Sequence, residues 1–358
     1  LSIVCNHLSL NMKIHIIFDI KPGPYGGGNQ FLKCLKSWLE SQSCYAKTPE
    51  DADLFLFNSH QHTLEVARIK RLYPKKPFIH RIDGPMRLYN KMSDRRDHVV
   101  NITNSLIADV TIFQSIWSQK KNLELGLLPT SFERVIHNAS DPKIFNTLGK
   151  PPFHSWEKIR LIATSWSPSK NKGFDTYHWL DENLNFDRYE MCFVGRSSIK
   201  FKNINLIPPL NSHGVAQKLR ESDIYITASQ KEPCSNSLIE ALSCGLPIVA
   251  LNDGGHPELT GVSGELFDDA RDIPRLLNKI VENPLNYLNQ PPLLSIAETG
   301  KKYCDLAKQV TDTVKINNYS PKKLNFWGYI MLIYTLLSYK LISYALHEEP
   351  IVVTSNIK

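Results

Sequence analysis

The sequence predicts an α/β protein made of two parallel, helix-covered sheets that face each other across a cleft. From residue 13 onward, apolar β-rich runs alternate with longer segments of helical spacing, which is typical of a parallel sheet wrapped in helices. The alternation stops once, in the proline- and glycine-containing stretch 140–158, and then restarts. At 358 residues, with 42% hydrophobic and 22% charged residues, the chain is long and apolar enough for two globular domains.

The first predicted domain covers residues 1–145. Met12 precedes its first strand, and we expect translation to start there, with residues 1–11 as an upstream extension. A helix is predicted over 30–40, because its apolar residues Phe31, Leu32, Leu35 and Leu39 share one face. Apolar runs predict strands at 13–20, 53–58, 78–82, 109–115 and 134–139.

The second predicted domain covers residues 146–319, and 347–358 form a tail. Helices are expected around 173–185, 212–221, 234–244 and 271–283. Strands are expected at 159–166, 189–195, 204–210, 223–229 and 247–252. Two consecutive α/β units of this kind leave a cleft at the carboxyl ends of both sheets, where such folds bind their ligands.

The most apolar stretch is 325–346. Its length approaches the ~20 residues that cross a bilayer, but its tyrosines and Lys340 argue against a span. We favour a helix, about 320–346, that packs back onto the first domain. The alternative is peripheral membrane contact through 325–346, with Lys322 and Lys323 at the lipid headgroups.

Charge and cysteine content narrow the classes of function. The formal charge of +7 is spread along the chain, so no nucleic-acid partner is indicated, whereas a phosphorylated small molecule or an anionic membrane would suit it. The seven cysteines are scattered, with neither zinc-site spacing nor a disulfide framework. We therefore expect a reducing compartment and a cytoplasmic protein.

Two segments have the pattern of a phosphate site. The turn KPGPYGGGNQ (21–30) follows a strand and opens a helix, so the backbone at Gly27 and Gly28 can approach an anion; a plain tight turn is the alternative. It lacks the dinucleotide fingerprint, which disfavours a nicotinamide-dependent dehydrogenase. In EPCSNSLIEALSCG (232–245), Ser235, Asn236 and Ser237 lie where a helix begins and its free N–H groups meet a phosphate.

Two glutamates bracket this second segment. Glu240 follows Glu232 by about two helical turns and can accept hydrogen bonds from a ribose diol. The alternative is that Glu232 only complements the helix dipole and that Glu240 faces solvent.

The segment EPCSNSLIEALSCGLPIVALNDGGHPEL (232–259) resembles the retaining GT-B glycosyltransferases of the large group 1 family, which is glycosyltransferase family 4-like. VIHNASDPKIF (135–145), SPSKNKGFD (167–175) and the early Gly-Gly turn extend the resemblance, which runs in order from about residue 13 to about residue 283. It implies two Rossmann-like domains, the second of which binds a nucleotide-sugar donor.

The resemblance also implies roles for single residues. Glu232 would lie near the donor sugar, and Glu240 would bind the ribose hydroxyls. A basic pair would steady the leaving diphosphate, but Trp166 stands where an arginine is usual, which leaves Lys170 and Lys172 as the cations. Lys172 is the better aligned of the two, and either lysine could instead be a solvated surface charge.

Four further residues are candidates from the strand ends of this arrangement. Asp83, in HRIDGPMRLY (80–89), is expected to contact an acceptor hydroxyl or the donor sugar, with His80 and Arg81 as nearby candidates; a simple turn is the alternative. Arg196, after a strand, is expected near the nucleotide or, alternatively, on the surface.

The expected function is a retaining transfer of a hexosyl unit from a nucleoside diphosphate sugar to a hydroxyl acceptor, a glycan or a lipid-linked one, as in polysaccharide biosynthesis. No cluster has metal-ligand spacing, so neither a metal nor a cofactor besides the donor is expected. A catalytically weak protein that binds a sugar nucleotide or a glycan is the alternative, because the usual arginine is missing.

Overall fold

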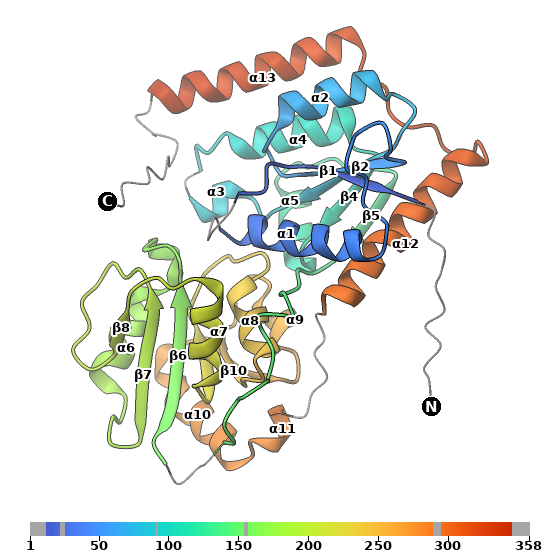
Figure 1. The fold of residues 1–358 in the computed structure, drawn as a ribbon. Coiled ribbons are helices and arrows are strands. Elements are labelled where there is room, and N and C mark those ends of the chain that lie inside the picture. The colour runs from blue at the N-terminus through green and yellow to red at the C-terminus, as the bar shows by residue number, and fades with distance from the viewer. Residues whose placement is uncertain (1–11, 22–25, 91, 154–156, 289–294, 346–358) are drawn as a thin grey trace, which may run out of the picture.

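The computed structural model describes residues 12–21, 26–90, 92–153, 157–288 and 295–345, and these form two α/β units stacked on one another (Figure 1). The predicted extension 1–11 and tail 347–358 lie outside the described residues, as do 22–25 of the glycine-rich turn and 154–156 of the linker. The predicted fold class, an α/β protein with two parallel sheets, is confirmed.

The first sheet is parallel and five-stranded, in the order β1-β2-β3-β4-β5. Its inner strands are buried on both faces, which explains why their sequences are continuous apolar runs. The strands and helices of this unit are β1 (Ile14–Ile17), α1 (Gly26–Ser41), β2 (Leu54–Asn58), α2 (Thr63–Leu72), β3 (Phe78–Ile82), α3 (Met86–Tyr89), α4 (Arg96–Ile107), β4 (Val110–Phe113), α5 (Ile116–Glu124) and β5 (Phe132–Val135).

The chain changes direction across this sheet at β1. Ile14 forms a parallel bridge with Tyr45 on the edge of β1 that faces away from β2, where its N–H donates to Cys44 O and its carbonyl accepts from Ala46 N. After this bridge the chain crosses back and builds β2 to β5 on the other side of β1. The reversal opens a crevice at the carboxyl end of β1, where the glycine-rich turn begins.

The second sheet is parallel and six-stranded, in the order β11-β10-β9-β6-β7-β8. The chain adds β7 and β8 on one side of β6 and then β9, β10 and β11 on the other side, so the strand order reverses between β6 and β9. Helices α7 and α8 pack on one of its faces, and α6 and α10 pack on the other. Its elements are β6 (Ile159–Ser165), a 3₁₀ turn (Lys170–Lys172), α6 (Phe174–Asn183), β7 (Tyr189–Gly195), β8 (Asn205–Ile207), α7 (Ser212–Arg220), β9 (Ile224–Thr227), α8 (Asn236–Ser243), β10 (Ile248–Leu251), α9 (His256–Thr260), β11 (Gly264–Phe267), a 3₁₀ turn (Ala270–Asp272), α10 (Ile273–Glu282) and α11 (Leu285–Leu288).

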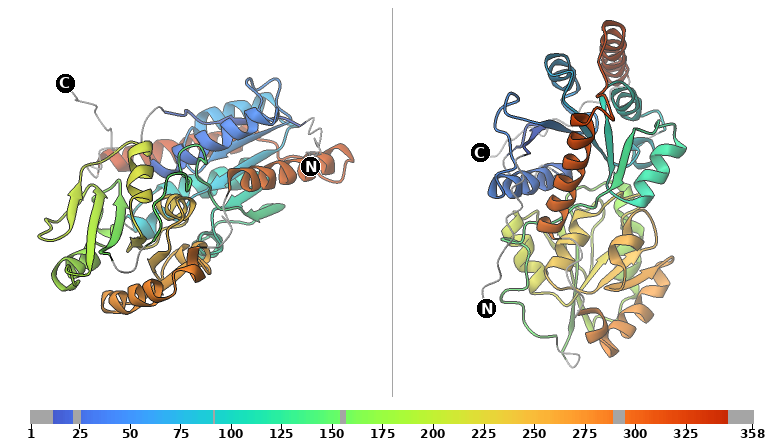
Figure 2. Two further views of the ribbon diagram at one scale, coloured as in Figure 1. Left: turned by 60° about the horizontal axis from the view of Figure 1, so that its bottom comes forward. Right: turned by 90° about the vertical axis from the view of Figure 1, so that its right-hand side faces the viewer.

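The last two helices, α12 (Ile296–Lys315) and α13 (Phe326–Ala345), both return to the first unit (Figures 1 and 2). Helix α12 packs beside α1 on one face of the first sheet, although the sequence placed residues 296–315 in the second domain. Helix α13 covers α4 on the opposite face. No helix of the described residues is long and apolar enough to cross a membrane.

Two strand predictions differ from the structure. The strand predicted at 134–139 is β5, Phe132–Val135, because the following residues leave the sheet and Asn138 bonds to the second unit instead. The edge strand β11 was missed, because its sequence GELF has no apolar run.

Gly300 tests the docking of α12 on α1. A Cβ at this position would lie 2.2 Å from the ring of Trp38, so we expect Gly300→Ala to lower the free energy of unfolding by about 1–2 kcal/mol despite its better helix propensity. Gly328→Ala in α13 is the matched control, because its Cβ would meet nothing closer than 3.2 Å, and it should change stability by less than about 1 kcal/mol. Denaturant unfolding measures both, and an unaffected Gly300→Ala protein would contradict this packing.

Candidate functional site

A cleft of about 430 Å³ lies between the two sheets. In each sheet it lies where the strand order reverses. Gly27 and Gly28 at the start of α1 and Asp83 after β3 line its first-unit side. The larger set of lining residues from the second unit includes Trp166, Lys172, Glu232, Ser235, Asn236, Ser237 and Glu240. Nine of the predicted site residues therefore share one cleft, while Lys170 and Arg196 are not among its described lining residues.

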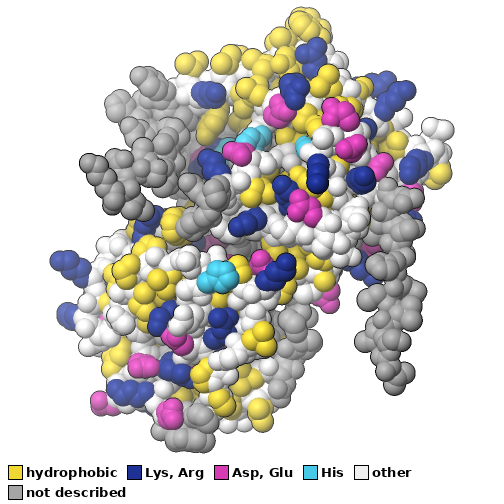
Figure 3. Space-filling model, in the orientation of Figure 1, with side chains coloured by type: hydrophobic (Ala, Val, Ile, Leu, Met, Phe, Trp, Pro, Cys, Tyr) yellow, Lys and Arg dark blue, Asp and Glu magenta, His cyan; other side chains and the backbone are white. Residues whose placement is uncertain are grey.

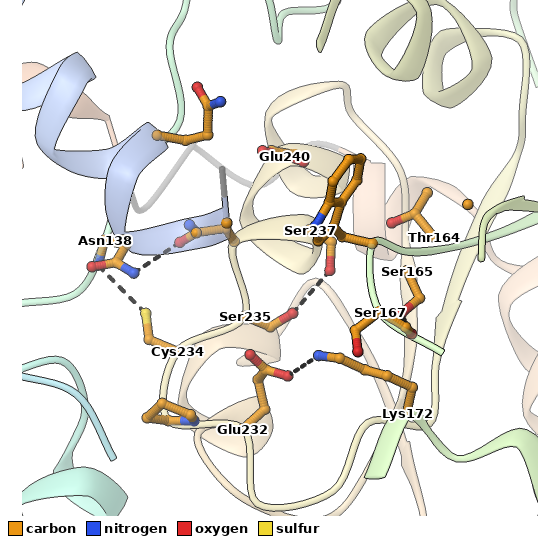
Figure 4. Close-up of a pocket in the computed structure, with 18 of the residues that line it drawn as sticks. Asn138, Thr164, Ser165, Ser167, Lys172, Glu232, Cys234, Ser235, Ser237 and Glu240 are labelled. Carbon is orange, nitrogen blue, oxygen red and sulfur yellow. Dashed lines mark hydrogen bonds and ion pairs between the residues drawn. The ribbon is translucent and has the colours of Figure 1, made fainter. Parts of the chain in front are cut away.

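Two helix N-termini meet in this cleft. Ser235 is the N-cap of α8, and its Oγ accepts a hydrogen bond from Leu238 N and lies 3.1 Å from Ser237 Oγ (Figure 4). In the first turn of α1, a Cβ on Gly27 would lie 2.5 Å from Asn236 Nδ2, so glycine is what permits this approach. Both helices point their N-terminal ends, and so the positive ends of their dipoles, at the same space, which is a setting for an anion.

Lys172 and Glu232 form an ion pair of 2.6 Å between Nζ and Oε2 (Figure 4). Burial opposes ionisation of Glu232, but the Lys172 charge outweighs it and holds the pKa of the carboxyl below its usual range. Burial likewise disfavours the Lys172 ammonium, and Glu232 reverses the effect and raises its pKa. Lys172 Nζ also lies 5.6 Å from the ring centroid of Tyr89, which comes from the other unit.

Glycines hold both members of this pair in place. Gly254 has φ of +64° and a Cβ there would lie 2.4 Å from Glu232 O, while Gly255 N donates to the same oxygen. Gly173 has φ of +76°, and a Cβ there would lie 2.2 Å from Ala228 O at the end of β9. Side chains larger than hydrogen would push both loops apart.

Glu240, on α8, also lines the cleft, away from the Lys172–Glu232 ion pair. Removal from water raises the pKa of its carboxyl to about 8, and no neighbouring charge offsets this effect. Burial thus favours the protonated carboxyl. A ligand with hydroxyl donors would favour its ionisation, because hydrogen bonds to the carboxylate stabilise the charged state.

Asp83 is positioned by buried polar groups. Its Oδ1 accepts hydrogen bonds from Arg81 Nη1 at 3.3 Å and from Gln114 Nε2. Arg81 and His80 themselves are fully buried in β3, where His80 bonds to Asn104 and to Ser59 O. They are structural, so the expectation that they are candidates for ligand contact is wrong.

Polar contacts of Asn138 and Glu258 help to tie the units together across the cleft. Asn138 receives a hydrogen bond from Arg81 and donates to Asn236 Oδ1 at 2.8 Å. Glu258, in the first turn of α9, accepts from the N–H groups of Ile116 and Trp117 and so caps α5 of the other unit.

Trp166 directly follows β6 and is paired with Arg196. The Arg196 guanidinium lies 4.4 Å from the centroid of the exposed Trp166 ring, which is cation–π distance. A Cβ on Gly195 would lie 1.8 Å from Ser165 O, so this glycine lets the end of β7 approach β6 closely enough to form the pair. Lys170 is exposed on the 3₁₀ turn before Lys172.

Sequence reasoning missed four polar residues of the site: Tyr89, Gln114, Asn138 and Glu258 in its interdomain role. Gln114 and Asn138 follow strands and Glu258 lies in the first turn of α9, which is a weak local signal, whereas Tyr89 only ends the short helix α3. Within the described residues, no three or more histidine, cysteine or acidic side chains are grouped so as to hold a metal ion.

Residues 187–283 match the family model "Glycosyl transferases group 1". A D-inositol 3-phosphate glycosyltransferase of Streptosporangium roseum is 31% identical over 85 residues, which are 23% of this chain. The chain spans about a fifth of that enzyme's length, 20%. The resemblance to group 1 glycosyltransferases predicted from the sequence is confirmed.

Solved structures share the fold of nearly the whole chain. Anabaena HepE in complex with UDP and glucose has a TM-score of 0.60 at 16% identity, over 85% of this chain and 99% of HepE. A sucrose-phosphate synthase from Thermosynechococcus elongatus has a TM-score of 0.59 at 13% identity, over 85% of this chain and 98% of the synthase. The two-domain GT-B fold is therefore shown.

Glu240 gives the cleft a pH signature. The pKa of its carboxyl is about 8 in the fold and 4.5 ordinarily, so its burial costs stability increasingly as the pH rises from about 4.5 through 8. We expect Glu240→Gln to melt higher than the wild type at pH 8.5 and to differ little at pH 4.5. Glu190→Gln, at an exposed glutamate of β7, is the control. A melting-temperature difference that is the same at both pH values would contradict this assignment.

Proposed function

We propose that the chain is a glycosyltransferase that moves a hexosyl unit from a nucleoside diphosphate sugar to a hydroxyl acceptor with retention of configuration. The observation that supports this most is the convergence of Lys172 and of the N-termini of α1 and α8 on one cleft, beside Glu232 and Glu240. A positive electrostatic setting next to two acidic side chains suits a ligand that has an anionic diphosphate and a sugar at each end.

The donor would lie with its diphosphate at the two helix N-termini. Gly27 and Gly28 supply backbone approach from α1, and Ser235, Asn236 and Ser237 supply N–H and hydroxyl donors from α8. Glu240 would accept hydrogen bonds from the ribose diol. HepE is described in complex with UDP and with UDP-glucose, which supports a nucleotide ligand for this fold.

Chemistry would take place where Glu232, Lys172 and Asp83 face the sugar end. The bond between the anomeric carbon and the phosphate oxygen breaks, and the acceptor oxygen forms its bond on the same face. The acceptor proton passes to the leaving diphosphate, which acts as the base. Lys172 and the helix amides stabilise the charge that develops on this diphosphate without a metal ion, Glu232 fixes Lys172, and Asp83 orients a hydroxyl.

Arg196 would supply the cation that Trp166 displaces. The guanidinium lies over the indole ring at the rim of the cleft, beside Ser165 and Ser167, which line it. A short side-chain rotation would bring it to a diphosphate, and the ring would limit the entropy lost in doing so.

The cytoplasmic location and the lack of a cofactor stay predictions.

The main test is turnover of a nucleotide sugar. A thermal-shift screen with GDP-, UDP- and ADP-sugars first selects the donor, and donor cleavage and transfer are then measured in EDTA. We expect Lys172→Ala and Glu240→Ala each to lower kcat/KM by about 10²–10³, because each removes a contact to the donor. Lys301→Ala, at an exposed lysine of α12, is the control.

Two outcomes would contradict the proposal. Wild-type rates in both variants would refute the assigned roles. Tight donor binding without cleavage or transfer by the wild type would replace the enzyme with a sugar-nucleotide-binding protein.

Arg196 is tested by diphosphate affinity. We expect Arg196→Ala to weaken binding of the matching nucleoside diphosphate by about tenfold, and Arg196→Lys to recover only part of the loss, because lysine lacks the planar fork. Binding of the free nucleoside should not change. Calorimetric titration measures both, and an equal loss for nucleoside and diphosphate would show that Arg196 acts on the base instead.

A further inference from the structure

Helix α13 presents a continuous apolar stripe to solvent. Trp327 is 76% exposed and Tyr334 is 71% exposed. Further large apolar side chains follow at helical spacing, so that the stripe runs along the whole helix (yellow along the top edge of Figure 3). We call it the α13 face, and it consists of Phe326, Trp327, Ile330, Met331, Tyr334, Leu337 and Leu341.

The opposite side of the same helix is packed on protein. Leu332 is fully buried and Thr335 is 3% exposed, and together with Tyr329 they lie against α4 and its surroundings. The helix is therefore fixed on the first unit, and its outward face is as apolar as its inward one. A monomeric protein in water rarely exposes a row of large apolar side chains of this length.

The rim of the α13 face is basic. The helix contains no acidic residue, and Lys323 and Lys340 are exposed at its two ends. Beside its first half, the Arg71 guanidinium of α2 lies 4.8 Å from the centroid of the Tyr329 ring. Among the described residues near the face, the acidic side chains of Glu65 and Asp94 are each paired with an arginine, so the lysines and Arg71 remain as net positive charge in this part of the structure.

We propose that the α13 face docks the protein on the surface of an anionic lipid bilayer. Tryptophan, tyrosine and aliphatic side chains suit the boundary between headgroups and acyl chains, and lysines at both ends suit anionic headgroups. A second copy of the chain fits less well, because docking two α13 faces would oppose their basic rims. Since protein covers the inward side, the helix lies along the membrane and is not surrounded by lipid.

The α13 face is connected to the cleft through the first unit. Helix α4, beneath α13, contains Asp97 in its first turn, and the Asp97 carboxylate accepts hydrogen bonds from the N–H groups of Met86 and Arg87 in α3. Met86 and Tyr89 of that same short helix line the cleft. Helices α4 and α3 of the first unit therefore link the α13 face to one side of the cleft.

Vesicle flotation tests the proposal with the full chain. Phosphatidylcholine vesicles with about 30% phosphatidylglycerol should float the protein, and pure phosphatidylcholine vesicles should float it at least about fivefold less, since each lysine near an anionic surface contributes ~1 kcal/mol. The double variant Trp327→Ser, Leu337→Ser should lose roughly tenfold or more of its binding. Both residues are exposed, and circular dichroism would check that the variant is folded.

A matched control removes apolar side chains elsewhere. Leu148→Ser, Val262→Ser affects two residues that are 79% and 62% exposed, far from α13 in sequence, and it should bind vesicles like the wild type. Lys323→Gln, Lys340→Gln should lower binding to the anionic vesicles alone.

Three results would overturn the proposal. The first is no flotation with anionic vesicles, and the second is equal binding by the wild type and the Trp327→Ser, Leu337→Ser variant. The third is light scattering that shows a dimer for the wild type and a monomer for this variant, with no vesicle binding by either. The last result would assign the α13 face to a second copy of the chain.

Discussion

The ion pair between Lys172 and Glu232 is the constraint around which the cleft is built. It joins the loop after β6 to the loop after β9. These two strands are neighbours, and the strand order of the second sheet reverses between them. Each partner is only 16–20% exposed, so neither charge is stable there without the other. Gly173, with a positive φ, lets the Lys172 loop approach Ala228 after β9, and Gly254, also with a positive φ, lets the loop after β10 pack on the backbone of Glu232. A ligand that meets this pair therefore meets groups that are already ordered and already charged.

The two units are coupled by polar groups, which allows their relative position to respond to a ligand. Glu258 caps a helix of the first unit, and Asn138 passes hydrogen bonds from the buried Arg81 to Asn236 at the start of α8. Such contacts exchange with water more readily than an apolar interface does. Closure of the cleft around a donor would exclude water from the leaving group, and so favour transfer over hydrolysis.

Much of the fold could be predicted because parallel strands buried on both faces leave continuous apolar runs, as in β2, β3 and β9. The cleft residues after those strands followed from topology, since carboxyl ends of parallel strands meet at one edge. What failed depends on long-range contacts. His80 and Arg81 are residue types common in functional sites, but their neighbours in the fold bury them. Helix α12 returns to α1 across about 250 residues of chain. Nothing in the local sequence encodes that Gly195 would bring Arg196 onto Trp166.

The central claim, that Lys172 and two helix N-termini hold a diphosphate, is tested most directly by comparing ligands that differ only in their phosphates. Calorimetry would measure the affinities of UDP and uridine, or of whichever base the protein prefers, for the wild type and for Lys172→Met. The account predicts that the diphosphate binds at least about a hundredfold more tightly than the nucleoside in the wild type, and that Lys172→Met removes most of this difference. Equal affinities for nucleoside and diphosphate, or a difference that survives Lys172→Met unchanged, would contradict it.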